Sequence, residues 1–170
     1  MFVGASKGLD RGALDLFQSV RAPWLDVVAS AIGILGQAEV AGGVALGLAI
    51  ARYRRDPREA IVPLFIAVTV LVESALKLFV PQAPPPHERA RTVELLPFLQ
   101  VPFANSFPSG HVARLAFLVR IGHRVPRWLA VGAVLLMAAS RLYLGEHWLS
   151  DVVGGAILGL GVANLARRLA

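Results

Sequence analysis

Long apolar stretches constrain the fold of this chain more than any other feature. Five of them lie at residues 27–51, 60–80, 108–122, 126–144 and 148–169. A helix needs about 20 apolar residues to cross the hydrocarbon core of a bilayer, and four of the five stretches reach that length. Charged residues make up 16% of the 170 residues, whereas a soluble domain carries about 25%. The pattern therefore predicts an all-α, polytopic membrane helix bundle with about five transmembrane helices.

Breaks within and between these stretches predict how the bundle is organised. Gly33 to Gly36 predict a break in the first helix, and Pro81 with the prolines that follow it ends the second. The third helix, 108–122, is short, so we expect protein or water around its ends. No linker divides the chain, which predicts a single integral membrane domain over residues 1–170.

Two further patterns concern the N-terminus and helix packing. Residues 8–20, GLDRGALDLFQSV, alternate apolar and charged residues at helical spacing. This predicts an N-terminal interfacial helix, and an ordinary surface helix or a frayed terminus fits the same pattern. Glycines four residues apart, at 43 and 47 and at 155 and 159, predict close helix packing.

The charge distribution and the lack of cysteine exclude several kinds of site. The net charge is +6 and the chain has no cysteine, which excludes disulfides, thiolate metal sites and a cysteine nucleophile. Three loops on one side of a five-helix zigzag carry the arginines Arg52, Arg54, Arg55, Arg58, Arg120, Arg124, Arg127, Arg167 and Arg168. Positive charge favours the cytoplasmic side, so we expect a cell-membrane protein whose other, outer face carries the site. No basic run with interleaved aromatic residues indicates a nucleic-acid partner.

The unusual polar residues gather at the predicted outer helix ends. The last of them lie in SRLYLGEHWLSD, residues 140–151, between two apolar stretches. Residues at positions i and i+4 of a helix share a face, so Asp151 can accept a hydrogen bond from one ring nitrogen of His147. That leaves the other nitrogen free to act as a nucleophile. A buried His–Asp pair with a structural role remains the alternative.

A second polar group opens the third helix. Pro108 suits a helix start and Ser109 suits an N-cap. The free N–H groups of a helix N-terminus favour a phosphate, and Gly110 lets a ligand approach the backbone. His111 follows, placed to donate a proton. A plain N-cap with an incidental histidine is the alternative.

Two cations complete the set. Lys77, late in the second helix, and Arg141 can both contact phosphate oxygens. The alternative for Lys77 is snorkelling to the interface, or an ion pair with Glu73 four residues before it.

Together these groups resemble the signatures of the type 2 phosphatidic acid phosphatase (PAP2) superfamily, K-x6-RP, PSGH and SR-x5-H-x3-D. PSGH is intact at 108–111 and SR-x5-H-x3-D at 140–151. The resemblance implies a membrane enzyme that dephosphorylates lipid phosphates or diphosphates, such as undecaprenyl pyrophosphate or phosphatidylglycerophosphate. It also implies His147 as nucleophile, His111 as general acid and Asp151 as the residue that orients His147. Lys77, Ser109, Gly110 and Arg141 would hold the phosphate.

The first signature departs from the family. After the six residues that follow Lys77, this chain reads Pro84-Pro85 in place of Arg-Pro. Arg89 or Arg91 from the loop, or Arg114 one helical turn after His111, is a candidate replacement for that arginine. Glu146, beside His147, also differs from the small or apolar residue common there, and would either repel an anionic substrate or point to water.

The resemblance implies that no metal or other cofactor is needed, because the cations are side chains, and that the partners are a lipid phosphate substrate and the bilayer. Two alternatives stay open beside hydrolysis by a phosphohistidine route. A lipid-diphosphate phosphotransferase would use the same intermediate, and a catalytically weakened relative would only bind lipid phosphate. A soluble haloperoxidase-like relative is disfavoured, because the chain is too short and too apolar. The lipid and the oligomeric state are not fixed by the sequence.

Overall fold

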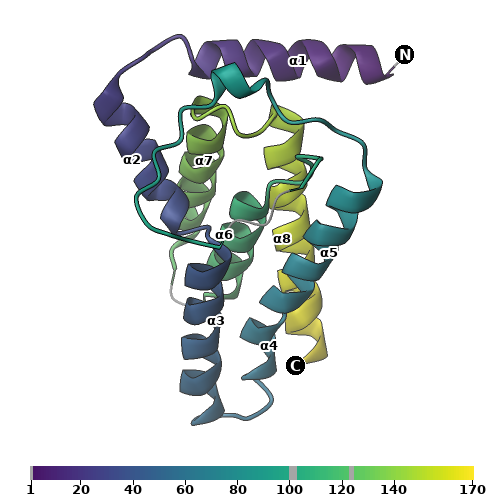
Figure 1. Ribbon diagram of the computed structural model, residues 1–170. Helices are drawn as coiled ribbons and strands as arrows, with labels where there is room; N and C mark the ends of the chain where they lie inside the picture. Colours follow the sequence, from purple (N-terminus) through teal and green to yellow (C-terminus); the bar gives the residue numbers. More distant parts are fainter. Residues whose placement is uncertain (1, 100–102, 123–124) are drawn as a thin grey trace.

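A computed structural model describes residues 2–99, 103–122 and 125–170. These residues form helices and connecting loops, with no β-strand among them, which confirms the predicted all-α class. The helices are α1 (Phe2–Phe17), α2 (Pro23–Ile34), α3 (Ala38–Tyr53), α4 (Ile61–Leu64), α5 (Ile66–Phe79), η1 (His87–Arg89), α6 (Gly110–Ile121), α7 (Arg127–Tyr143) and α8 (Leu149–Leu169). Figure 1 shows α3, α5, α6, α7 and α8 running lengthwise, with α1 lying across one end.

The predicted break in the first apolar stretch is confirmed. Residues 27–51 fall in two helices, α2 and α3, which bend by 40° at the break between them. If this pair counts as one span, three segments in the described chain are long and apolar enough to cross a membrane, the others being α4–α5 (Ile61–Phe79) and α8. The stretches 108–122 and 126–144 also form helices, but α6 has 12 residues and α7 has 17. Both are shorter than the roughly 20 residues of a perpendicular span.

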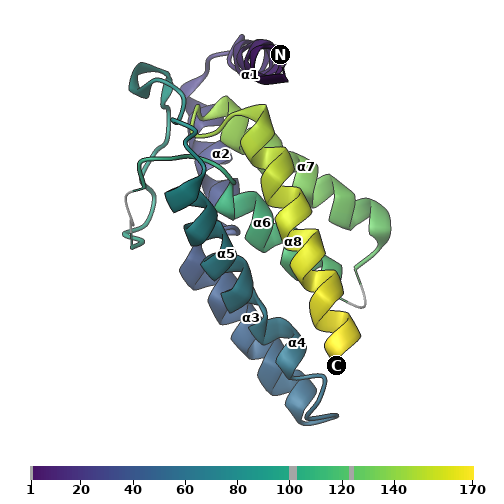
Figure 2. The same cartoon turned by 90° about the vertical axis from the view of Figure 1, so that its right-hand side faces the viewer.

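The short helix α6 lies at the centre of the bundle, which meets the expectation that protein surrounds it (Figure 2). Its apolar residues Val112, Ala113, Ala116, Phe117 and Ile121 are fully buried. Its closest neighbour is α8, because a side chain at Gly155 or Gly159 would run into α6. The predicted packing role is therefore confirmed for these two glycines. Gly43 and Gly47 on α3 have no atoms within 4 Å of an added side chain among the described residues, so that part of the packing prediction is wrong within one chain.

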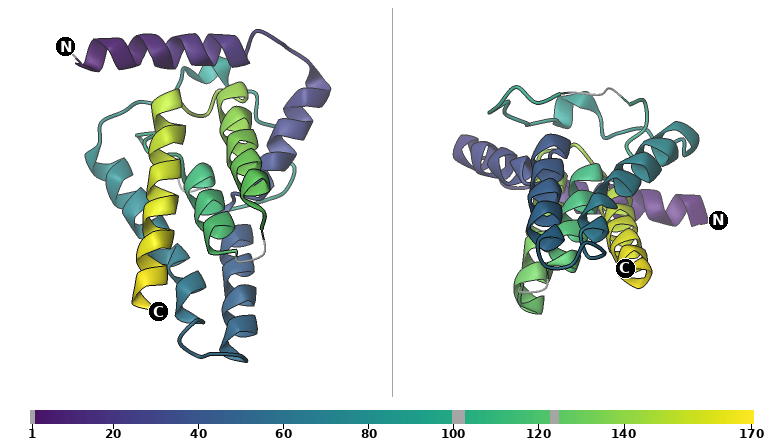
Figure 3. Two further views of the ribbon diagram at one scale, coloured as in Figure 1. Left: turned by 180° about the vertical axis from the view of Figure 1, so that it is seen from behind. Right: turned by 90° about the horizontal axis from the view of Figure 1, so that it is seen from below.

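Helix α1 confirms the predicted N-terminal helix. It lies across the end of the bundle that is opposite the C-terminus (Figure 3). Asp10, Leu14 and Gln18 are buried against the bundle, while Leu9 and Leu16 are exposed. Residues four apart thus share the buried face, as the helical spacing requires.

Two chemically different ends result from this arrangement. The arginine-rich loop between α3 and α4 lies at the end that also holds the C-terminus, far from α1 (Figure 1). The long loop between α5 and α6 runs across the opposite end, beneath α1 (Figures 1 and 2). Arg124, one of the loop arginines, lies outside the described residues. The segment 108–111 at the start of α6 and the segment 140–151 between α7 and α8 meet where the Ser109 backbone N–H donates to the Asp151 carbonyl.

Candidate active site

The His147–Asp151 pair forms as the sequence predicts, but in a different setting. His147 Nδ1 lies 3.2 Å from Asp151 Oδ2. His147 precedes the first residue of α8, so the two residues do not share a helical face. Instead Asp151, in the first turn, reaches back and also accepts a 2.9 Å hydrogen bond from the Trp148 backbone N–H. The same carboxylate therefore stabilises the start of α8 and holds the imidazole.

The PSGH segment places two polar atoms at the start of α6. Ser109 occupies the N-cap position, but its side chain makes no capping hydrogen bond, so the predicted cap is only positional. Among the described residues, neither the buried Ser109 Oγ nor His111 Nε2 has a hydrogen-bond partner. Buried polar groups are nearly always satisfied, and those that are not deserve an explanation. The Ser109 backbone N–H donates to the Asp151 carbonyl at 2.9 Å, which ties this segment to the start of α8.

Arg141 is almost fully buried at the end of α7. Its guanidinium donates to Glu146 Oε2 at 2.7 Å and to the Ala29 carbonyl at 3.1 Å. A side chain at Gly33 would overlap this guanidinium, so the glycine-containing end of α2 makes room for it. Glu146 also accepts a hydrogen bond from Thr92. The Glu146 carboxylate therefore points towards Arg141 and Thr92 and not to water, and its charge compensates that of the Arg141 guanidinium.

Glu146 lies in the loop between α7 and α8, and its charge follows from these contacts. Burial disfavours the charged carboxylate, but the positive charge of Arg141 and the hydrogen bond from Thr92 outweigh that cost. Together they lower the pKa of Glu146 below its ordinary value. The side chain therefore stays ionised at neutral pH.

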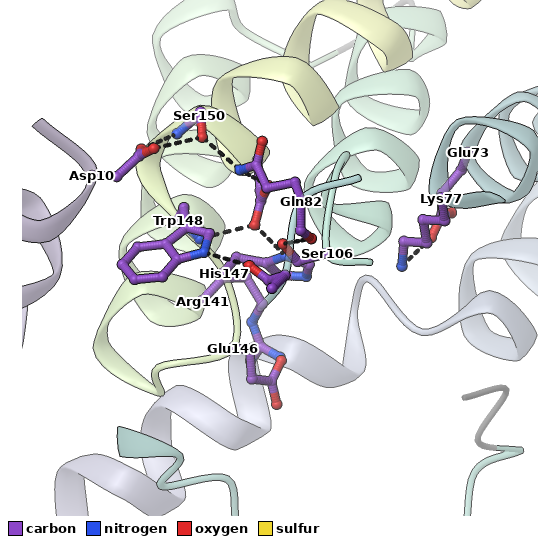
Figure 4. Close-up of polar contacts among 12 residues, drawn as sticks. Asp10, Glu73, Lys77, Gln82, Ser106, Arg141, Glu146, His147, Trp148 and Ser150 are labelled. Carbon is purple, nitrogen blue, oxygen red and sulfur yellow. Dashed lines mark hydrogen bonds and ion pairs between the residues drawn. The ribbon is translucent and has the colours of Figure 1, made fainter. Parts of the chain in front are cut away.

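A second carboxylate, Glu73, organises the cations on the other side. Its oxygens lie 3.1 Å from Lys77 Nζ and 2.5 Å from an Arg114 nitrogen, so the predicted ion pair with Lys77 is confirmed. Arg114 also donates to the Gly36 carbonyl at 2.7 Å. Figure 4 shows Glu73 and Lys77 on α5, apart from the group around His147. Gly110 is needed at the start of α6, because a side chain there would overlap the Glu73 carboxylate.

The three candidate replacements for the missing arginine differ in position. Arg114 lies in the wall of the cavity described below. Arg89 instead forms an ion pair with Asp15 of α1 at 2.9 Å. Arg91 donates to the backbone carbonyls of Gln18 and Val20. The structure thus brings Arg114 to the site and engages Arg89 and Arg91 with the α1 segment.

One cavity of about 680 Å³ joins these groups. Its polar wall contains His111, His147, Lys77, Arg114 and Arg141, together with Glu73 and Glu146. Its apolar wall includes Ile34, Val70, Leu95, Leu96, Phe98 and Phe103. A volume of roughly 300–1,000 Å³ is typical of small-molecule sites. In the described parts of the chain, no three His, Asp or Glu side chains are arranged to hold a metal ion.

Sequence reasoning missed several contacts at this site. Gln82 Nε2 lies 2.7 Å from Asp151 Oδ1 and 2.8 Å from Ser150 Oγ (Figure 4). Ser150 in turn donates to Asp10 of α1. Gln82 and Asp151 are 69 residues apart, and a lone glutamine in a proline-rich loop gives no periodic or motif signal.

Comparison with known proteins agrees with this geometry. The family model described as the PAP2 superfamily matches residues 58–170. The chain belongs to the PAP2 superfamily. The match includes all three signature regions, including the first one, in which Pro84 stands in place of the arginine.

Individual relatives of the superfamily show how far the likeness extends. The chain is 29% identical to phosphatidylglycerophosphatase B of Bacillus subtilis over 159 residues, covering 83% of this chain and 73% of the relative. It is 25% identical to the bacitracin transport permease protein BcrC of Bacillus licheniformis over 124 residues, covering 69% of this chain and 60% of that relative.

Two solved PAP2 structures share the fold. The crystal structure of a transmembrane PAP2-type phosphatidylglycerolphosphate phosphatase from Bacillus subtilis superposes with a TM-score of 0.78, at 24% identity, over 96% of this chain and 85% of that one. LpxE of Aquifex aeolicus superposes with a TM-score of 0.72, also at 24% identity, over 94% and 95% of the two chains. At this identity the likeness establishes the fold alone.

Proposed function

We propose that this protein is a membrane lipid phosphatase that works through a phosphohistidine intermediate without a metal ion. The observation that carries the proposal is the single cavity whose wall contains both imidazoles, His111 and His147, with the cations Lys77, Arg114 and Arg141. The family and the named activity of the phosphatidylglycerophosphatase relative support a phosphatase.

The first step is transfer of the phosphoryl group to His147. Asp151 accepts the Nδ1–H, so Nε2 carries the lone pair that forms the new bond to phosphorus. The bond between phosphorus and the lipid oxygen breaks as His111 gives that oxygen a proton. Lys77, Arg141 and the start of α6 at Ser109 and Gly110 stabilise the negative charge on the phosphoryl oxygens.

The second step returns the enzyme to its starting state. Water attacks phosphorus, the bond to His147 Nε2 breaks, and His111 takes the proton released by the water. Inorganic phosphate leaves. Positive charge in this scheme comes from side chains alone. Arg141 replaces part of its hydrogen bonding to Glu146 with hydrogen bonds to the phosphate of the substrate.

The apolar wall supports a lipid as the phosphate carrier. Leu95, Leu96, Phe98 and Phe103 belong to the loop between α5 and α6, which lines part of the cavity. They offer apolar surface next to the polar wall, as an amphiphile with a charged head group requires. The charge asymmetry of the two ends supports a cytoplasmic location for the α3–α4 loop and an outer location for the site.

The test is phosphate release by the purified protein from a panel of lipid mono- and diphosphates, with His147→Ala beside the wild type. We expect turnover by the wild type, none by His147→Ala, and an acid-labile phosphoprotein from labelled substrate in the wild type only. Near-normal phosphate release by His147→Ala would refute the nucleophile. Label that passes to an added lipid acceptor instead of water would identify the phosphotransferase alternative.

A further inference from the structure

The contacts of Asp151 point to a residue outside the family signatures. Asp151 is fully buried, and both of its carboxylate oxygens are engaged. Oδ2 accepts from His147 and from the Trp148 backbone. Oδ1 accepts from the side-chain amide of Gln82 at 2.7 Å. The orientation of the carboxylate is therefore set by Gln82 on one side and by α8 on the other.

Hydrogen-bond chemistry fixes which way the Gln82 amide faces. Its nitrogen lies near two oxygens, Asp151 Oδ1 and Ser150 Oγ, and an amide nitrogen has two hydrogens to donate. Ser150 Oγ donates its own hydrogen to Asp10 at 3.0 Å, so it is available to Gln82 as an acceptor. The reversed amide would place its carbonyl oxygen against a carboxylate. Only the donating orientation satisfies all three residues.

The backbone around Gln82 is anchored as well. The Ser106 backbone N–H donates to the Gln82 carbonyl at 2.8 Å, and the Ser106 hydroxyl donates to it at 3.2 Å. The Trp148 indole N–H donates to the Ala83 carbonyl at 2.8 Å. These bonds hold the Gln82 segment against Ser106 of the same loop and against Trp148, the residue that follows His147. Figure 4 shows Gln82, Ser106, His147 and Trp148 gathered together.

We propose that Gln82 is a positioning residue for the nucleophile, acting through Asp151. A carboxylate whose Oδ1 is held by Gln82 presents Oδ2 to His147 in one orientation, which keeps the proton on Nδ1 and the lone pair on Nε2. The Gln82 amide nitrogen is bonded to Asp151 and Ser150, so we expect its loss to act on the chemical step and not on substrate binding. This inference rests on the proposed phosphatase function.

The first test replaces Gln82 by Met, which keeps the length of the side chain and removes the N–H donors. We expect kcat to fall by about ten- to hundredfold, as is common when partners of a catalytic group are lost, with KM unchanged. Gln18→Met is the matched control, because it removes a buried amide at the same end of the bundle with no bond to Asp151. We expect this control to lower the melting temperature and to retain kcat.

The second test uses Gln82→Glu. An ionised Glu at this position lies against the Asp151 carboxylate, with His147 and Asp10 as the other ionisable groups in the hydrogen-bond chain. Like charges repel, so kcat falls at neutral pH. Protonation restores a donor, so the pH optimum moves to the acid side of the wild-type optimum. A structural role alone would lower activity without moving the optimum.

The outcomes separate this inference from the proposed function. A wild type that releases no phosphate from any lipid phosphate refutes the proposed function. An active wild type with unchanged kcat in Gln82→Met refutes the role of Gln82. An equal loss of kcat and of melting temperature in Gln82→Met and Gln18→Met, with no shift of the pH optimum in Gln82→Glu, also refutes it.

Discussion

Replacing Asp151 by Asn tests the link between the fold and the chemistry. Asp151 accepts three hydrogen bonds, from His147, the Trp148 backbone and Gln82. In the Asn variant the same three donors face a side chain with only one acceptor oxygen, because the other oxygen is replaced by a donating nitrogen. An Asn that accepts from Trp148 or Gln82 turns its nitrogen towards another donor. His147 then loses the acceptor that keeps the proton on Nδ1.

The magnitude follows from the change of tautomer. In serine proteases the equivalent Asp→Asn replacement leaves the geometry intact and lowers kcat about 10⁴-fold, because the histidine holds its proton on the wrong nitrogen. A factor of about 10⁴ corresponds to about 5 kcal/mol of lost transition-state stabilisation. Stability falls as well, by about 1–3 kcal/mol, because a donor near the start of α8 loses its partner.

The assay is phosphate release together with thermal unfolding in the same detergent. We expect Asp151→Asn to lower kcat by at least about 10³-fold while the protein stays folded at the assay temperature. The phosphohistidine signal from labelled substrate should fall with it. A folded Asp151→Asn variant with kcat within about tenfold of wild type would refute the orienting role.

Three further predictions follow from the cavity, from Glu146 and from the two ends of the bundle. Arg114→Gln should raise KM by about tenfold, because the cavity wall loses a cation. Adding Pro84→Arg to this variant should lower KM again. If KM does not recover, an arginine at position 84 does not contribute to phosphate binding. Glu146 has a lowered pKa in the folded state, so its contribution to stability is present above the unfolded pKa and lost as pH falls through the folded one. The melting temperature of the wild type should therefore exceed that of Glu146→Gln at neutral pH and converge with it in acid, and a pH-independent difference would contradict the ion pair. Because the chain has no cysteine, Arg55→Cys and Glu88→Cys can be labelled in intact cells with an impermeant thiol reagent, and we expect only the second to react.

The helices could be predicted because their signals are local. Apolar length, the glycines near position 36 and the prolines after position 80 predicted the helices and breaks to within a few residues. The prediction that α3 packs closely through its glycines was wrong for a physical reason. Glycines at positions 43 and 47 allow close approach but do not determine which surface approaches, and none of the described residues packs against them.

The site could be predicted in part. The identity of the polar residues in the motifs indicated the chemistry, and the motifs' order along an alternating bundle placed them at one end. The pairs four residues apart, His147 with Asp151 and Lys77 with Glu73, were predictable. The other contacts were not, because they join distant segments through single hydrogen bonds. Arg141 with the Ala29 carbonyl and Gln82 with Asp151 have sequence separations of 112 and 69 residues. In each bond one partner, the Ala29 carbonyl or Gln82, does not stand out in its local sequence.

The carboxylates explain how three cations can share one apolar bundle. Burying an uncompensated charge costs several kcal/mol, so Lys77, Arg114 and Arg141 need negatively charged partners in the absence of substrate. Glu73 neutralises the first two in part, and Glu146 pairs with the third. An arriving phosphate therefore competes with carboxylates already in place, and its affinity reflects the difference between the two sets of contacts. Because Glu146 is the more exposed of the two carboxylates, the Arg141 pair should open more readily than the buried Glu73 cluster, and substrate entry should begin there.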